Sequence, residues 1–355
     1  MASRRVACGV IGAGWWGTHA HIPALLRHSG AELVAIQTRD PDDAGKVARH
    51  FAIPQAFTSA DELIAVPGLE AVVISSPPHL HYPQARAALL RGLHVLVEKP
   101  MTLSATQARE LVRLAEQNGR HLLVSSPWHY TRHGKEARRL VLDGHLGEVR
   151  MVSVLMTNPV DQLIRGTGTQ APHGLPFLHP QPGTYSEPAI AGGGQSYTQV
   201  SHVAAYLVFL TGARPARVFA RYHNDGSRLD IYDAISLEMD NGCIVSIAST
   251  GATPVYRRDF EVRVFGTKAI LFLELWQGRM ELVPLDGGAP TVYEPLAREE
   301  VYPEQAPAGN LVDCVLDGAP NLAAGSVGLA AMEILDAAVR SVRAGRNILV
   351  RRPEG

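Results

Sequence analysis

Short apolar runs alternate with amphipathic segments over the first third of the chain. The runs VACGVI, AELVAI, AVVIS, HVLVE and HLLVSS carry Val, Ile and Leu at consecutive positions, which is typical of parallel strands buried on both faces. Helical patterns separate these runs, and Ser104 and Gly119 fit the N-cap and C-cap of the last one. This alternation predicts a doubly wound α/β domain with a parallel sheet over residues 1–126.

From about residue 148 the apolar runs become longer and often alternate with polar residues, as in VRMVSVLM, ARVFARYH, AISLEM, CIVSIAST, FEVRVFG and AILFLEL. Asp240-Asn241-Gly242 predicts a tight hairpin, and Gly266-Thr267 a second one. Residues 127–355 are therefore expected to form an α+β domain with an open, mostly antiparallel sheet. It ends in two amphipathic helices, NLVDCVLDG and SVGLAAMEILDAAVRSVRAG, which we expect to pack back on the first domain.

The stretch 157–190 is rich in Pro and Gly and shows little periodicity. An irregular connection of this length inside a compact protein is usually a lid or a binding loop. We therefore predict a functional loop that covers a cleft.

Composition narrows the possible classes of protein. The 355 residues exceed the size at which single cores stop growing, which is about 250–300 residues, so two domains are expected. The net charge of −1 gives no basic surplus for nucleic acid or anionic lipid, and no run reaches the roughly 18 apolar residues of a membrane span. Three cysteines without CxxC spacing, and an N-terminus without a signal-peptide pattern, favour reduced thiols and a cytoplasmic protein.

The first strand leads into GAGWWG, which places Gly12, Gly14 and Gly17 in GxGxxG spacing before a helix. Such glycines allow a tight turn, close approach of a pyrophosphate and close helix packing, and the helix N-terminus attracts the phosphates. The whole turn is predicted to bind a dinucleotide, as in a Rossmann domain, with Ala13, Trp15 and Trp16 included. Trp15 would lie at the nicotinamide side, although simple packing explains either tryptophan equally well.

The end of the second strand bears on the choice between NAD and NADP. An acid here would bind the adenine ribose, but the sequence reads Gln37-Thr38-Arg39-Asp40. A hydroxyl beside a guanidinium suits a 2′-phosphate, so NADP(H) is preferred over NAD(H), with Thr38 and Arg39 as its ligands. The alternative is that Arg39 is solvated and that Asp40 or Gln37 holds an NAD ribose.

Two more polar motifs follow strands, at the sheet edge where ligands bind in open α/β folds. SPPHLH follows AVVIS and supplies Ser76, Pro77, His79 and His81 as candidate cofactor ligands. Glu98-Lys99-Pro100 follows HVLV, and a lysine there would lie near the nicotinamide and stabilise a developing alkoxide. Glu98 and Lys99 are therefore also candidate cofactor ligands, and Pro100 is a candidate cis proline.

GVIGAGWWG, SPPHLH, VEKP, LDGHLGEVR and GGG-x7-H, in this order, resemble the Gfo/Idh/MocA oxidoreductases, a group that includes glucose–fructose oxidoreductase and inositol dehydrogenase. The resemblance extends from about residue 5 to the final AGRNILV. It implies that Lys99 contacts cofactor and substrate, and that His202 lies on a helix lining the active site. The chain departs from the family pattern at Thr198, where relatives carry aspartate, and at Ala205, where relatives often carry another acid.

The i, i+4 spacing of Thr198 and His202 predicts that both share one helix face. His202 could accept the hydroxyl proton as hydride leaves, but without the aspartate it should be less basic, and Lys99 would do more of the acid–base work. Alternatively, His202 is a buried histidine bonded to a backbone carbonyl. Further candidate substrate-binding residues are Trp128, His129, Gln195 and Tyr197. No ligand set for a metal is complete, so none is predicted.

The leading interpretation is an NAD(P)-dependent oxidoreductase that transfers a hydride to or from a secondary hydroxyl or ketone of a sugar, cyclitol or glycoside. A second interpretation is a glycosidase that cleaves its substrate through transient oxidation, like the NAD-dependent glycosidases of the same family. A third, a cofactor-binding regulatory protein, is disfavoured because Lys99 and His202 are both retained. A homodimer or homotetramer formed through the second sheet is expected, as in relatives.

Overall fold

The computed structural model describes residues 4–168, 177–180 and 183–350. Its first sheet has six parallel strands in the order β3-β2-β1-β4-β5-β6. The strands are β1 (Val6–Ile11), β2 (Ala31–Gln37), β3 (Gln55–Phe57), β4 (Ala71–Ile74), β5 (His94–Val97) and β6 (Leu122–Val124). This order, with β1 and β4 at the centre, confirms the doubly wound domain.

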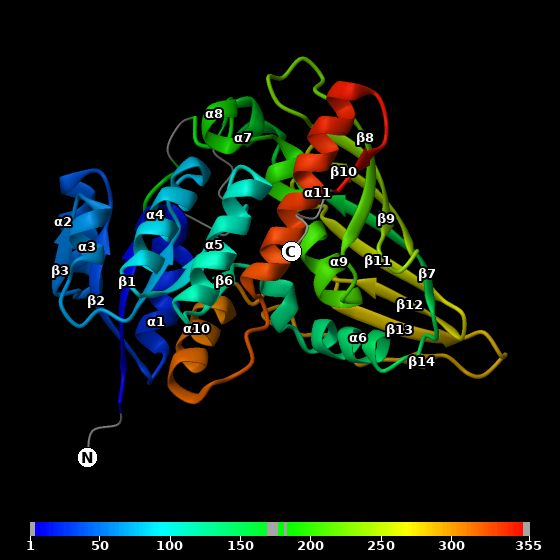
Figure 1. Cartoon of the computed structure of the whole chain (residues 1–355), viewed down its shortest axis with the longest axis horizontal. Coiled ribbons are helices and arrows are strands. Elements are labelled where there is room, and N and C mark those ends of the chain that lie inside the picture. Colours follow the sequence, from blue (N-terminus) through cyan, green and yellow to red (C-terminus); the bar gives the residue numbers. More distant parts are fainter. Residues whose placement is uncertain (1–3, 169–176, 181–182, 351–355) are drawn as a thin grey trace.

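Helices cover both faces of this sheet, which explains the continuous apolar strands (Figure 1). One face packs against α3 (Ala60–Ile64), α4 (Pro78–Leu90) and α5 (Ala105–Gln117). The other packs against α1 (Ile22–Arg27), α2 (Pro41–Phe51) and α10 (Ala306–Asp317). The Ser104 hydroxyl accepts a hydrogen bond from the Gln107 amide, so the predicted N-cap of α5 is confirmed.

The second sheet has nine strands in the order β14-β13-β12-β11-β7-β10-β9-β8-β15. They are β7 (Val149–Thr157), β8 (Pro215–His223), β9 (Tyr232–Met239), β10 (Ile244–Thr250), β11 (Asp259–Gly266), β12 (Ala269–Glu274), β13 (Arg279–Pro284), β14 (Thr291–Val292) and β15 (Ile348–Leu349). Among the strands of the described residues, only β7 and β10 pair in parallel, so the sheet is mostly antiparallel, as predicted. Asp240-Asn241-Gly242 joins β9 to β10, and Gly266-Thr267 leads from β11 into β12.

One face of the second sheet is covered by helices and the other is open. Helices α9 (Ser201–Thr211) and α11 (Gly325–Ala344) lie between the two sheets, and α6 (Arg132–Leu142) packs against α9 (Figure 1). Helix α11 contacts β6 of the first sheet and α5, which packs on that sheet, and it also contacts β8 and α9. A single apolar core therefore spans both sheets. The final two helices therefore pack against the first domain. This packing fixes the two sheets relative to one another, and with them the two walls of the cavity described below.

Cys8, Cys243 and Cys314 are buried free thiols. Within the described residues, no helix combines the length and the hydropathy that a membrane crossing requires.

Candidate active site

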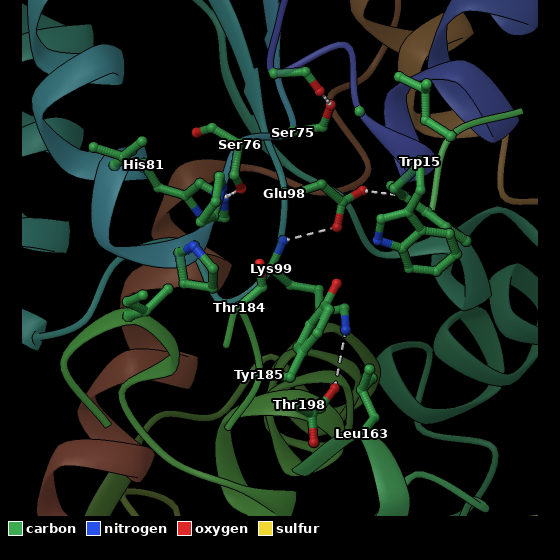
Figure 2. Close-up of a pocket in the computed structure, with 18 of the residues that line it drawn as sticks. Trp15, Ser75, Ser76, His81, Glu98, Lys99, Leu163, Thr184, Tyr185 and Thr198 are labelled. Carbon is green, nitrogen blue, oxygen red and sulfur yellow. Dashed lines mark hydrogen bonds between the residues drawn. The ribbon is translucent and has the colours of Figure 1, made fainter. Parts of the chain in front are cut away.

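A cavity of about 530 Å³ lies at the carboxyl ends of the parallel strands (Figure 2). Its wall runs from the glycine turn after β1, past the ends of β2, β4 and β5, to the start of α9 and the strands of the second sheet. Described parts of the 157–190 segment also border it, among them α7 (Asp161–Arg165) and the residues just before α8 (Pro188–Ala191). The cavity therefore has the location expected of a nucleotide site in an open α/β sheet.

The three glycines of GAGWWG have distinct steric roles. Gly12 has φ of +80°, and a Cβ there would lie 2.3 Å from the Ser76 backbone nitrogen, so only glycine fits. A Cβ at Gly17 would lie 2.9 Å from the Gly12 oxygen, which reflects the close packing of the next helix on the strand. A Cβ on Gly14 would meet nothing within 4 Å. The turn thus leaves free space beside Gly14, where the sequence predicts a pyrophosphate.

At the end of β2 the structure separates the candidates for ribose binding. The Gln37 side chain accepts from the Gly12 amide and donates to the Thr58 carbonyl. Asp40 caps α2 by accepting from the amides of Asp42 and Asp43. Arg39 is exposed, borders the cavity and forms no ion pair within the described part of the chain. Gln37 and Asp40 therefore have structural partners, whereas the Arg39 guanidinium is available to a ligand.

SPPHLH forms the turn between β4 and α4. The hydroxyl of Ser75 donates to the Gly12 carbonyl, and the hydroxyl of Ser76 donates to Gln84. His81 is buried, with one ring nitrogen 2.8 Å from the Pro100 oxygen and the other 2.7 Å from the Ser76 oxygen. His81 therefore links the SPPHLH turn to the Glu98-Lys99-Pro100 turn, and neither of its ring nitrogens is free for a cofactor.

Pro77 and His79 also border the cavity. The pKa of His79 is lowered by burial and by the nearby Arg39 guanidinium. His79 is therefore mostly neutral near pH 7, and it lies on the side of the cavity where Arg39 is found.

Glu98 is buried at the base of the cavity, in a network of donors. Trp16 Nε1 donates to Oε1 (2.8 Å), His21 Nε2 lies 2.9 Å from the same oxygen, and the Lys99 amide donates to Oε2 (3.0 Å). Burial would raise the pKa of Glu98, but hydrogen bonding and charge from His21, with help from Lys99, hold it at about 2. Glu98 is thus an ionised carboxylate that orients both Trp16 and the backbone of Lys99.

The Lys99 side chain reaches across the cavity to the second domain. Its Nζ donates to the Thr198 carbonyl at 3.0 Å, and Figure 2 shows the two groups pointing toward one another. Burial lowers the pKa of Lys99, while the Glu98 carboxylate opposes that effect. The Lys99–Pro100 peptide bond is cis, as predicted. An ammonium with a lowered pKa at a cavity wall suits proton donation and binding of developing negative charge.

AGGGQSYTQVSH forms the entry into α9. A Cβ at Gly194 would lie 2.1 Å from the Asp230 carbonyl oxygen, so the glycine allows the two segments to approach. The buried Asp230 carboxylate accepts from the amides of Gly194 (2.9 Å) and Ser196 (2.6 Å), and so satisfies the first donors of the helix. Residues Ser196–Val200 form a π-helix that continues as α9. π-helical turns are frequent at functional sites because they change which backbone groups are free.

Thr198 and His202 both border the cavity, but they do not bond to one another. The Thr198 hydroxyl donates to the Gly194 carbonyl at 2.8 Å. His202 has no hydrogen-bond partner among the described residues, and its ring packs edge-on against Trp128 at 5.1 Å between centroids. Burial and the neighbouring Lys99 charge lower the pKa of His202 well below 6.5. The structure therefore places a neutral, unbonded imidazole in the cavity wall, and no backbone carbonyl occupies it.

An aromatic wall encloses the cavity next to His202. Trp128 contacts Trp276 (5.2 Å between centroids) and Tyr302 (4.6 Å), and those two rings contact each other at 5.2 Å. Trp128 was a candidate from the sequence, whereas Trp276, two residues after β12, and Tyr302, in a connection, were missed. A tryptophan shortly after an apolar strand is the only signal that the sequence offered for them.

Other cavity residues that sequence reasoning missed are Asn158, Tyr185, Gln199 and Arg258. Tyr185 belongs to the predicted loop, and burial raises its pKa to about 12 against the effect of a hydrogen bond with Trp15. The prediction that the 157–190 segment borders a cleft thus holds for its described residues.

Five sequence candidates do not border the cavity. Ala13 belongs to the apolar core, and Gly17 packs against the Gly12 backbone. The ring of His129 stacks on Phe209 at 4.1 Å, and its Nδ1 lies 3.0 Å from the Leu322 carbonyl oxygen. Gln195 donates to the Ser249 hydroxyl, and Tyr197 donates to the Leu103 carbonyl. The predicted contacts of these three polar side chains with substrate are corrected, because each is turned into the protein interior.

Sequence comparison agrees with this arrangement. Residues 6–126 match the oxidoreductase family with an NAD-binding Rossmann fold, and residues 135–272 match the GFO/IDH/MocA C-terminal domain. The chain belongs to the Gfo/Idh/MocA oxidoreductase family. The D-xylose 1-dehydrogenase (NADP(+)) 2 of Haloferax volcanii is 30% identical over 247 residues, which cover 69% of this chain and 70% of that protein.

Two further relatives are informative. The dTDP-3,4-didehydro-2,6-dideoxy-α-D-glucose 3-reductase of Streptomyces antibioticus is 36% identical over 160 residues, 45% of this chain and 48% of that protein. The match thus spans about half of that relative's length. The solved structure of GenD2 from gentamicin A biosynthesis, in complex with NAD, is 25% identical, with a TM-score of 0.80 over 99% of this chain and 98% of that one.

Proposed function

We propose that this protein is an NADP(H)-dependent oxidoreductase that transfers a hydride between the nicotinamide and a secondary hydroxyl or ketone of a sugar, cyclitol or glycoside. The observation that carries the proposal is that Lys99 and His202 both border the cavity that begins at the glycine turn. The names of the relatives from Haloferax volcanii and Streptomyces antibioticus, a xylose dehydrogenase and a dTDP-sugar reductase, support a sugar-like substrate.

When bound, the cofactor supplies the hydride acceptor or donor. The chain's own residues must then accept or donate one proton. In the oxidation direction the neutral His202 ring accepts the proton of the substrate hydroxyl, while the Lys99 ammonium, held by the Thr198 carbonyl, hydrogen-bonds the same oxygen and stabilises the charge that develops on it. The aromatic wall excludes water and offers faces on which a sugar ring can pack.

The preference for NADP rests on Arg39. We expect Arg39→Ala to weaken NADP⁺ binding about tenfold and to leave NAD⁺ binding unchanged, because only NADP⁺ carries a 2′-phosphate for the guanidinium. Calorimetric titration of both nucleotides measures this. Arg49→Ala removes an exposed arginine of α2 that does not border the cavity and serves as the matched control. Equal affinity for the two nucleotides in the unaltered protein, unchanged in Arg39→Ala, would contradict the preference.

The uncovered face of the second sheet supports the proposal of a homodimer or homotetramer. Residues that alternate with the buried ones along β9 and β10 are exposed, including Tyr232 (40%) and Ile244 (54%). Pairing of two such faces would bury them. Sedimentation velocity at micromolar concentration tests this, and a monomer would count against it.

The proposed activity is tested with a panel of sugars, inositols and glycosides and both nucleotides. We expect reduction of NADP⁺, followed by the absorbance of the reduced nicotinamide, with at least one free sugar or cyclitol. Release of an aglycone without net cofactor reduction would instead assign the protein to the redox-assisted glycosidases and would refute the proposed net reaction.

A further inference from the structure

Arg258 stands out among the cavity residues because it is a partly buried cation with no anionic partner. Its guanidinium lies over the Trp276 ring, with Cζ 5.3 Å from the ring centroid, and no ion pair joins it to any described residue. Burial lowers the pKa of Arg258, yet a guanidinium stays charged at any physiological pH. Removing a charge from water without a counter-charge costs free energy. An anionic group of a ligand would supply that counter-charge to Arg258.

Asp259 follows Arg258 in the chain, and Glu98 and Glu304, like Arg258, act on the pKa of the Tyr302 phenol; all three carboxylates have other partners. Asp259 accepts from the Thr157 hydroxyl (2.8 Å) and from Arg257 Nε (3.3 Å). Glu304 lies 2.9 Å from His19 Nε2. Glu98, as described above, is bound by Trp16 and His21. Each of these carboxylates therefore bonds to a group other than Arg258.

The position of Arg258 is fixed by its neighbours. Strands β7 and β11 are antiparallel with Thr157 opposite Asp259, so Asn158, directly after β7, and Arg258, directly before β11, lie at the same end of the pair. Asn158 Nδ2 donates to Gln199 Oε1 at 3.1 Å, and both amides border the cavity. On its other side, Arg258 stacks on Trp276, which contacts Trp128, which in turn contacts His202. The guanidinium therefore lies on the same wall as the histidine, beside two side-chain amides suited to hydroxyl groups.

We infer that Arg258 binds an anionic substituent of the substrate, a carboxylate or a phosphate carried by the same polyhydroxylated molecule whose hydroxyl reaches His202. Stacking on Trp276 holds the planar guanidinium, which leaves its N–H donors free for a bidentate contact. The inference rests on the proposed function and narrows its substrate class to sugar acids or sugar phosphates.

The test uses two pairs of compounds that differ in charge: D-glucuronate with its methyl ester, and D-glucose 6-phosphate with D-glucose. Binding to the protein loaded with NADPH is measured by calorimetry, and kcat/KM is measured with NADP⁺. We expect the anionic member of one pair to be preferred by about 10- to 100-fold. Which pair shows the preference distinguishes a carboxylate from a phosphate.

Three variants assign that preference to Arg258. Arg258→Met should abolish the difference between the charged and the neutral member of each pair, while Arg258→Lys should retain part of it. Arg257→Met is the matched control, because Arg257 is the adjacent, exposed arginine already paired with Asp259, and it should retain the full preference. Thermal melting of each variant shows whether it is folded.

Two results would overturn the inference: no preference for either anion in the unaltered protein, or a preference that survives in folded Arg258→Met. Failure of the proposed function looks different, since it gives no NADPH binding, or no hydride transfer to any compound, neutral ones included.

Discussion

Replacing Lys99 with methionine is expected to lower kcat about 1,000-fold, while the dissociation constant for NADPH changes by less than about tenfold. The substitution keeps the length of the apolar stem but removes the ammonium, which donates to the Thr198 carbonyl at 3.0 Å and which the charge of the Glu98 carboxylate favours. Charge that develops on the substrate oxygen then has no cation beside it. Steady-state kinetics on a substrate identified with the panel, together with a fluorescence titration of NADPH, measures both effects.

Lys135→Met is the matched control for this experiment. Lys135 is an exposed residue of α6 that does not border the cavity, so its loss should leave kcat unchanged. A Lys99→Met protein that is folded, binds NADPH and turns over at a near-normal rate would remove Lys99 from the reaction.

Much of the fold could be predicted because the burial of a strand determines its pattern of apolar residues. Strands covered on both faces read as continuous apolar runs, and the Asn-Gly turn fixed one hairpin. Strand β3 was missed because it has three residues, two of them exposed, and β13–β15 because they are short or alternate weakly. Such segments become strands because they pair with neighbouring strands, and their own local sequence pattern does not predict that pairing.

The residues of the site likewise fall into two groups, those that the sequence predicted and those that it did not. Motifs at the ends of parallel strands were found because chain direction alone brings them to one edge. The pairing of strands in the second sheet brings Arg258 and Trp276 to the cavity, and a long connection brings Tyr302. The spacing of these residues in the sequence therefore does not predict that they meet. The Asp230 carboxylate, which holds the start of the helix that presents His202, was missed for the same reason.

Thr198 and His202 both border the cavity, in agreement with the shared helix face that their i, i+4 spacing predicts. The sequence did not predict that Ser196–Val200 is a π-helix or that the Thr198 hydroxyl bonds within its own helix. Thr198 therefore contributes its backbone carbonyl, to Lys99, rather than its side chain, to His202.

His202→Asn is expected to lower kcat about 100-fold, because the cavity then lacks the neutral ring that accepts the substrate proton. Asparagine keeps a polar side chain at this buried position, so NADPH binding and the melting temperature should change little. Steady-state kinetics in the oxidation direction measures the loss, and Ser201→Ala, at the adjacent helix position that does not border the cavity, is the control.

The pH dependence of kcat separates a proton acceptor from a positioning residue at 202. Burial and Lys99 lower the pKa of His202 well below 6.5, so the ring stays neutral, and oxidation should stay fast, as the pH falls to about 6.5. Thr198→Asp adds a carboxylate to the cavity wall that carries the ring, which stabilises the imidazolium and raises its pKa, so the rate should now fall at a higher pH than in the unaltered protein. Adding His202→Asn to Thr198→Asp should remove this new fall in rate at low pH. If that fall persists without the histidine, or if the aspartate leaves the profile where it was, the proton is accepted elsewhere, and Lys99 becomes the leading candidate among the residues that border the cavity.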